Sequence, residues 1–107
     1  MIAILYHVHM LPGKEALYQT HWKVVANYFR DHRGALGSTL HKNEGSLWVI
    51  HSKWPDEKTW KASWPKDGSI AETLPASVQA SIKIMKSCVD KTQEIKPMVL
   101  HIKDSLG

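Results

Sequence analysis

Near its start the chain switches from a two-residue hydrophobic period to a helical one, and this switch constrains the fold more than any other feature of the sequence. Residues 2–10 alternate between two sets of side chains, which predicts a β-strand. Pro12 and Gly13 end the strand, and apolar residues then recur at helical spacing up to about residue 31. The helical stripe comprises Leu17, Trp22, Val25 and Phe29, widened by Ala16, Val24 and Tyr28.

Three further segments have the composition or the alternation of strands. They lie at residues 36–42, 47–54 and 98–103. Together with two more helices, the order becomes β-α-β-β-α-β, with an extra short helix after the third strand. This order predicts a ferredoxin-like split βαβ fold of the α+β class, in which helices cover one face of a four-stranded antiparallel sheet. With 107 residues, the chain is expected to form a single domain, residues 1–107.

Local signals indicate where the helices begin and end. Gly34 is placed to form the left-handed cap of the first helix. Asp56 follows a proline and is placed as the N-cap of a short helix that ends near residue 63. Residues 69–72 have the form of a capping box. A further helix, broken at Pro75, is expected to run to about residue 91.

The charge pattern argues against nucleic acid as a partner. The net charge is +4 and the isoelectric point is about 9.3, but the lysines are scattered singly and no run of four basic residues exists. The RNA-recognition motif has the same element order, and it stacks bases on aromatic side chains. Here the strand at 47–54 lacks that motif's basic-glycine-aromatic start, and the first strand offers only Tyr6.

The start of the chain and its cysteine content bear on location. The first residues are apolar without a basic leader, and His7 and His9 interrupt them, so neither a signal peptide nor a membrane span is expected. Cys88 is the only cysteine, which excludes an internal disulfide and fits a reducing compartment. We expect a cytoplasmic protein with no membrane partner, and a structural role for the Cys88 thiol.

The second face of the predicted sheet needs a cover. Ile4, Tyr6, Val8 and Met10 are expected to meet the helices, which leaves Ala3, Leu5, His7 and His9 on the opposite face. On the second and fourth strands, Thr39 with His41 and Val99 with His101 are expected to share that opposite face. A second copy of the same sheet is a suitable cover, which predicts a homodimer; the rival is an open sheet that binds another molecule.

Four histidines on that face form a candidate cluster: His7, His9, His41 and His101. A metal site needs three or four ligands in fixed geometry, and no acidic residue is placed among them. We therefore predict no metal and a hydrogen-bonding cluster at a dimer interface. If so, charging the imidazoles below about pH 6 should weaken association.

The stretch HSKWPDEKTW, residues 51–60, concentrates aromatic residues at the switch from strand to helix. Trp54 ends the strand, and Trp60 is expected to point back and wedge the short helix on the sheet, a core role. Trp22 and Trp64 have polar neighbours and are the more open candidates for lining a cavity.

The run GALGSTLHKNEGSLWVIHSKWPDEKTW resembles the antibiotic-biosynthesis-monooxygenase (ABM-type) domain, a branch of the dimeric α+β barrel superfamily. The positions that carry the resemblance are Leu11-Pro12-Gly13, Gly34, Gly37-Ser38, Trp54, Asp56 and Trp60. The resemblance covers residues 1–65 clearly and the fourth strand loosely. It implies a homodimer whose two sheets face each other, with a pocket between the sheet and the helices of each subunit.

The resemblance also implies an activity: oxygenation of a small aromatic or polyketide-like molecule without a cofactor. An electron-rich phenol would lose a proton, and its anion would react with oxygen in a dry apolar pocket. His51 and His21 are the candidate bases. The candidate pocket walls are Tyr6, Trp22, Tyr28, Trp48, Trp54, Trp60 and Trp64.

Two alternatives to this activity stay open. The first is a non-catalytic dimer that binds a small ligand. The second is a haem-degrading relative, and it requires an axial histidine near Thr73, whereas no histidine occurs between His51 and His101. In such relatives the strand-one asparagine position corresponds to Tyr6, and the tryptophan position corresponds to Ser63, one residue before Trp64.

Overall fold

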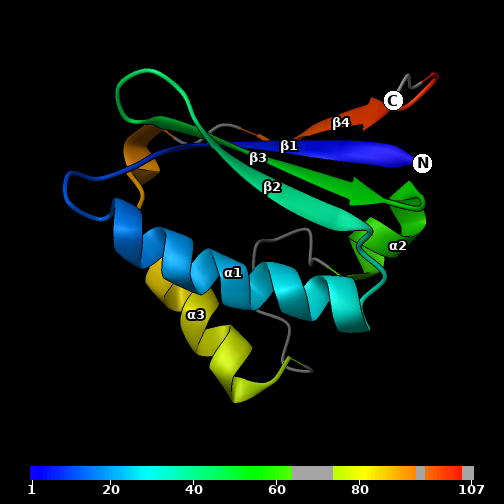
Figure 1. Cartoon of the computed structure of the whole chain (residues 1–107), viewed down its shortest axis with the longest axis horizontal. Coiled ribbons are helices and arrows are strands. Elements are labelled where there is room, and N and C mark those ends of the chain that lie inside the picture. The colour runs from blue at the N-terminus through cyan, green and yellow to red at the C-terminus, as the bar shows by residue number, and fades with distance from the viewer. Residues whose placement is uncertain (64–73, 94–95, 105–107) are drawn as a thin grey trace.

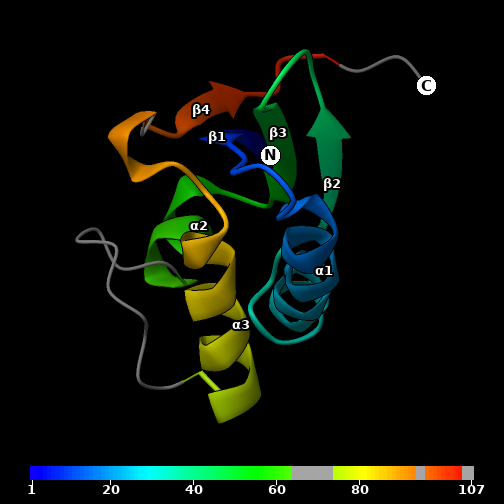
Figure 2. The same ribbon diagram turned by 90° about the vertical axis from the view of Figure 1, so that its left-hand side faces the viewer.

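A computed structural model describes residues 1–63, 74–93 and 96–104. The elements are β1 (Ile2–His9), α1 (Glu15–His32), β2 (Gly37–Lys42), β3 (Leu47–Trp54), α2 (Glu57–Ser63), α3 (Ala76–Ser87), a 3₁₀ turn (Lys91–Gln93) and β4 (Met98–His101). The strands form one layer, and α1 and α3 lie side by side against one of its faces (Figures 1 and 2). The predicted α+β, ferredoxin-like fold is confirmed.

The sheet has the strand order β2-β3-β1-β4, and every neighbouring pair is antiparallel. Directly opposed residues have side chains on the same face, so the register fixes both faces of the sheet. Ile2 opposes Trp54 and Tyr6 opposes Ile50, which places the most apolar side of each central strand toward the helices. The first-strand prediction is thereby confirmed.

The register corrects the expected orientation of the fourth strand. His101 opposes Ile2 and Val99 opposes Ile4, so both lie on the helix-facing side and not on the opposite face. Met98 and Leu100 oppose Leu5 and Ala3, so they occupy the opposite face, where Val99 and His101 were expected. Residues 98–100 are all apolar, so alternation could not set the phase of this strand.

We call the sheet side turned away from the helices the outer face. Its members are Ala3, Leu5, His7 and His9 of β1, Leu47, Val49, His51 and Lys53 of β3, Thr39 and His41 of β2, and Met98 and Leu100 of β4.

Helix α1 buries the predicted stripe except at its first member, where Tyr18 replaces Leu17. Tyr18, Val25 and Phe29 are buried, whereas Leu17 is 42 % exposed, so the assignment of Leu17 to the core was wrong. Tyr18 lies four residues before Trp22 and joins it in the cluster around Met10. Gly34 follows the helix with φ +84° and confirms the predicted left-handed cap.

The other helices begin largely as the sequence predicts. The Thr59 amide donates to Asp56 Oδ1 at 2.7 Å, which confirms the N-cap of α2 and holds the pKa of that carboxyl below its usual value. α3 begins directly after Pro75; the predicted capping box at 69–72 lies outside the described residues. α3 ends at Ser87, short of the predicted residue 91, because the next residues pair with the end of β1, through a bridge from Met10 to Val89.

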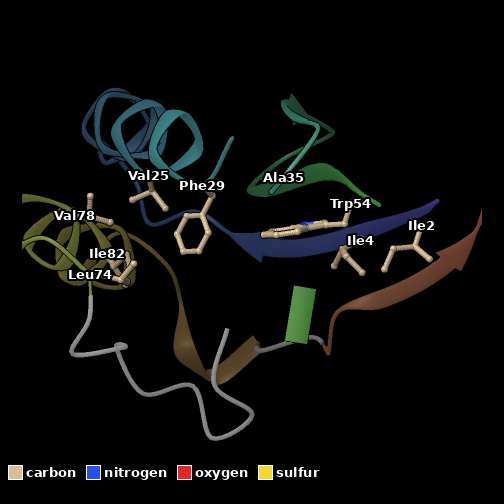
Figure 3. Close-up of a cluster of buried hydrophobic side chains, with 9 residues drawn as sticks. All are labelled: Ile2, Ile4, Val25, Phe29, Ala35, Trp54, Leu74, Val78 and Ile82. Carbon is tan, nitrogen blue, oxygen red and sulfur yellow. The ribbon is translucent and has the colours of Figure 1, made fainter. Parts of the chain in front are cut away.

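The apolar interior consists of two adjoining clusters. The first contains Ile2, Ile4, Val25, Phe29, Ala35, Trp54, Leu74, Val78 and Ile82; in Figure 3, the Phe29 and Trp54 rings lie between the helices and the sheet. The second contains Met10, Tyr18, Trp48, Ile50 and Cys88, and Cys88 is fully buried, unpaired and packed. Tyr6 and Met85 contact both clusters and join them.

Candidate functional site

A surface hollow of about 220 Å³ lies between α1 and β2, at the edge of the sheet where the helix runs along the strand. We call it the α1–β2 hollow, and Figure 2 shows the two elements that form it. Its lining consists of Trp22, Lys23, Ala26, Asn27 and Arg30 from α1, and Leu36, Gly37 and Ser38 from the start of β2.

Helical spacing divides the α1 wall into two strips. Trp22 and Ala26 are four residues apart and form an apolar strip. Lys23, Asn27 and Arg30 follow the same spacing one position further on and form a polar strip. Each strip therefore offers a different chemistry to the same space.

The β2 wall is narrow and bears one hydroxyl. A Cβ built on Gly37 would meet no atom within 4 Å, so the space beside it is open. Ser52 Oγ donates to Ser38 Oγ at 3.1 Å, and the Ser38 hydroxyl retains its own proton for a further hydrogen bond. The β2 wall can therefore donate to a ligand oxygen.

Trp22 links the hollow to the interior. Its ring is partly buried against the second apolar cluster, and its indole N–H is buried with no acceptor among the described residues. A buried donor without a partner costs about 1–3 kcal/mol. The indole N–H groups of Trp48 and Trp54 are likewise buried without an acceptor among the described residues, so Trp22 offers a ligand its ring rather than its N–H.

The other predicted pocket walls occupy the interior and do not line the hollow. Trp54 is 2 % exposed and packs against Phe29, with ring centroids 6.3 Å apart, and Trp48 is also buried. The Trp60 Nε1–H donates to the Tyr6 hydroxyl at 2.8 Å, as the predicted wedge requires. Burial raises the pKa of Tyr6 to about 12, so its phenol stays neutral near pH 7.

Tyr28 and Trp64 remain to be placed. Tyr28 lies near the end of α1, where it stacks on His32 at 4.8 Å and has the Arg33 guanidinium 5.9 Å from its ring centroid. It does not line the α1–β2 hollow. Trp64 lies outside the described residues.

Neither candidate base reaches the hollow. His21 Nδ1 lies 2.9 Å from Ser81 Oγ and joins α1 to α3, which uses the ring as a helix–helix contact. His51 opposes Leu5 and Thr39 and therefore lies on the outer face, so its expected place between sheet and helices is wrong. The lining side chains include no imidazole and no carboxylate.

The outer face gathers four histidines, although not the four predicted. His7, His9 and His41 lie there as expected, while His51 takes the place expected for His101. His9 Nδ1 is 3.0 Å from Ser46 Oγ, and His7 Nδ1 is buried with no partner among the described residues. Within the described ranges, no group of three histidine, cysteine, aspartate or glutamate residues could hold a metal ion.

A second hollow lies between the end of α1 and α2. It is more open, encloses about 540 Å³, and its lining of His32, Arg33, Asp56, Lys58, Thr59, Ala62 and Ser63 contains no large apolar side chain. The α1–β2 hollow is therefore the better candidate for a flat apolar ligand. No helix in the described part of the chain is long and apolar enough to cross a membrane.

Sequence reasoning identified only part of this site. Trp22 was predicted as a cavity wall, and Gly37-Ser38 carried the family resemblance, but Lys23, Asn27 and Arg30 were missed. The spacing of these three residues was the available signal.

Comparison with known proteins supports the fold. No family model matches the chain, and no curated protein is significantly similar in sequence. A Chloroflexus aurantiacus structure assigned to the antibiotic biosynthesis monooxygenases superimposes with a TM-score of 0.72 at 16 % identity, covering 99 % of this chain and 96 % of that one. A Deinococcus radiodurans structure with the same assignment gives 0.69 at 14 % identity, covering 100 % and 97 %.

A third similar structure has a named activity. SnoaB, a cofactor-independent oxygenase from Streptomyces nogalater, superimposes with a TM-score of 0.70 at 10 % identity, covering 98 % of this chain and 95 % of that one. At such identities the likeness shows a shared fold. The chain therefore has the ABM-type fold that its sequence resembles.

Proposed function

We propose that the protein is a cofactor-independent monooxygenase that acts on a small aromatic or polyketide-like compound bound in the α1–β2 hollow. The observation that carries the proposal is Trp22, the aromatic wall of the hollow, on whose ring a flat substrate can stack. The ABM-type fold, shared with a named cofactor-independent oxygenase, supports the choice of reaction.

The reaction needs no external reductant. A phenol with an activated CH₂ group loses a proton, and the resulting carbanion gives its electrons to O₂ and forms a carbon–oxygen bond. The peroxide then loses water, so that CH₂ and O₂ become C=O and H₂O. Both electrons used to reduce the second oxygen atom come from the substrate.

The residues of the hollow would position the substrate rather than take its proton. The Trp22 ring offers a face for stacking, and the Ser38 hydroxyl is a donor for a developing oxyanion. No lining side chain is a carboxylate or an imidazole, so the proton passes to water, or the substrate binds already ionised. The proposal thus favours substrates that ionise readily.

The volume limits the substrate. An apolar cavity of about 150 Å³ holds a benzene molecule. The 220 Å³ of the α1–β2 hollow is therefore suited to one or two fused rings and is smaller than typical drug-sized pockets of about 300–1,000 Å³.

We further propose that the protein is a homodimer whose subunits meet through the outer face. Leu5, Val49, Met98 and Leu100 supply apolar area there, and Met98 and Leu100 are 49 % and 41 % exposed. A symmetric contact through this face would bury them together. The single cysteine, buried and unpaired, supports a cytoplasmic location.

Oxygen uptake with 1,3-dihydroxynaphthalene, whose keto tautomer carries the activated CH₂ group, tests the proposal, with uptake in buffer alone subtracted. We expect enzyme-dependent uptake that falls about tenfold or more in Trp22→Ala and less in Trp22→Phe. Lys83→Gln, on exposed α3 surface away from the hollow, is the matched control and should retain full activity. Uptake no faster than in buffer contradicts the reaction, and full activity of Trp22→Ala contradicts the site.

The alternative of a non-catalytic binding dimer uses the same hollow. It predicts that 1,3-dihydroxynaphthalene quenches tryptophan fluorescence of the wild type more than of Trp22→Phe, without being consumed. The haem-degrading alternative is weaker, because its axial position near Thr73 holds no histidine and lies outside the described residues. Haem titration followed by visible absorbance separates it from the other two.

A further inference from the structure

The charge of the α1–β2 hollow is one-sided. Lys23 and Arg30 line it, and no lining residue is acidic. They are seven residues apart on α1, which places them on one side of the helix about 10 Å apart along its axis.

The acidic residues of α1 do not cancel both cations. Glu15 pairs with Lys42 at 3.5 Å, at the far end of the helix from Arg30. Asp31 lies 3.2 Å from Arg30 Nε, in a pair whose two side chains are each 55 % exposed. Among the described residues, no ion pair includes Lys23.

Arg30 still has donors to offer. Asp31 contacts Nε, whereas the guanidinium carries five N–H donors in a planar fork that matches a carboxylate. Asn27 lies between Lys23 and Arg30 on the same strip and adds an amide donor. The polar strip is therefore chemically suited to a carboxylate.

We propose that the α1–β2 hollow selects aromatic substrates that carry a carboxylate, with Arg30 and Lys23 as the specificity-determining residues. The ring lies against Trp22 and Ala26, and the carboxylate meets the Arg30 fork with Lys23 nearby. The inference rests on the proposed function, because it takes this hollow as the substrate site. It adds that the substrate carries a carboxylate, which neither the fold nor the reaction requires.

Two ligands of the same shape test the inference by titration calorimetry in low salt: 2-naphthoate and its neutral counterpart 2-naphthamide. We expect 2-naphthoate to bind about tenfold more tightly, since charge-assisted hydrogen bonds exceed neutral ones. Added salt should reduce this ratio. Equal affinity for the two ligands, or no binding of either, overturns the inference.

Variants assign the preference to residues. Arg30→Gln should bring the affinity ratio close to one and leave the Kd of 2-naphthamide unchanged, while Arg30→Lys retains part of the ratio. Lys23→Gln should lower the ratio, and Lys83→Gln, the control, should preserve it. If Arg30→Gln weakens both ligands equally, Arg30 has a structural role and the inference is overturned.

A substitution at Asp31 should strengthen the binding of 2-naphthoate, whereas the substitutions at Arg30 and Lys23 should weaken it. Asp31→Asn removes the carboxylate that competes for Arg30, so the affinity for 2-naphthoate should rise. A fall contradicts the arrangement. These outcomes are distinct from failure of the proposed function. A preference for 2-naphthoate that depends on Arg30, without oxygen uptake, retains the binding inference and rejects the oxygenase. Oxygen uptake without such a preference retains the oxygenase and rejects the binding inference.

Discussion

The Tyr6 hydroxyl is the polar centre of an otherwise apolar interior. It accepts the Trp60 indole N–H at 2.8 Å, across 54 positions of the chain. Tyr6 therefore fixes α2 against β1 as well as filling space between the two clusters. A residue predicted as a pocket wall proves to be a structural link.

Tyr6→Phe should destabilise the protein by about 1–3 kcal/mol, because the Trp60 donor is then buried without an acceptor. Urea unfolding followed by circular dichroism measures the loss. Tyr28→Phe is the matched control and should change stability by less than about 0.5 kcal/mol, since the Tyr28 ring contacts do not use its hydroxyl. Equal stability of Tyr6→Phe and the wild type would reject the link.

Alkaline pH provides a second test at the same residue. The pKa of Tyr6 is raised by burial from 10.0 to about 12, against the lowering effect of the Trp60 hydrogen bond. The unfolded chain loses the proton first, so stability is full below pH 10 and falls as pH rises toward 12, by up to roughly 2–3 kcal/mol. Burial also raises the pKa of Tyr18, which acts in the same direction.

Urea midpoints at pH 8 and pH 11 measure this decline. It should be smaller in Tyr6→Phe than in the wild type, with the remainder due to Tyr18 and other groups. An identical decline in both proteins would show that Tyr6 titrates normally in the folded state.

At the scale of elements, Gly34 joins three parts of the fold. It ends α1 with φ +84°, it precedes the turn into β2, and a Cβ placed there would lie 3.0 Å from the Thr59 methyl of α2. The close approach of α2 to the end of α1 therefore depends on the absence of a side chain.

Gly34→Ala should cost about 1–2 kcal/mol for the left-handed backbone and more for the contact with Thr59. Gly45→Ala is the matched control, since Gly45 has φ +63° and open space around its Cβ position. The excess loss in Gly34→Ala over Gly45→Ala, from urea unfolding, isolates the contact. Equal losses would mean that Thr59 moves aside freely.

The types and order of the elements were predictable because hydrophobic period depends on local geometry. Phase was not. A stripe through Leu17 and one through Tyr18 have similar apolar content, and only packing on Met10 and Trp48 selects Tyr18. Likewise, pairing with β1 decides which side of β4 carries His101.

Only the α1 wall of the candidate site was predictable, because helical spacing is a local property and the position of β2 is not. The spacing of Lys23, Asn27 and Arg30 is visible in the sequence, but nothing local indicates that β2 will lie beside them. The placement of His51 failed because a strand's two faces become distinct only when its neighbours are known.

At the scale of the whole molecule, the proposed dimer makes the outer face decisive. Leu100→Asp should place a charge in the interface and yield a monomer of 12.2 kDa, where the wild type has about twice that mass by light scattering. Leu17→Asp, on the exposed side of α1, is the matched control and should remain dimeric. A wild-type mass of one subunit would reject the dimer.

The same face predicts a dependence on pH. His7, His9, His41 and His51 face the proposed partner together with Lys53, and none of the strand residues described on this face is acidic, although Asp90 lies close to His9. Acidification that protonates these imidazoles adds positive charge to an already cationic surface and should raise the dimer dissociation constant. Light scattering at pH 5 and pH 8 measures it; a dimer equally stable at both values argues against this interface.

Tyr6 and Met85 touch both interior clusters, so we expect the two clusters to unfold together. Heating should then give a single calorimetric transition, and the amides of β1 should exchange with deuterium only through whole-chain opening. Any new residue at Tyr6 must therefore fit the packing of both clusters at once.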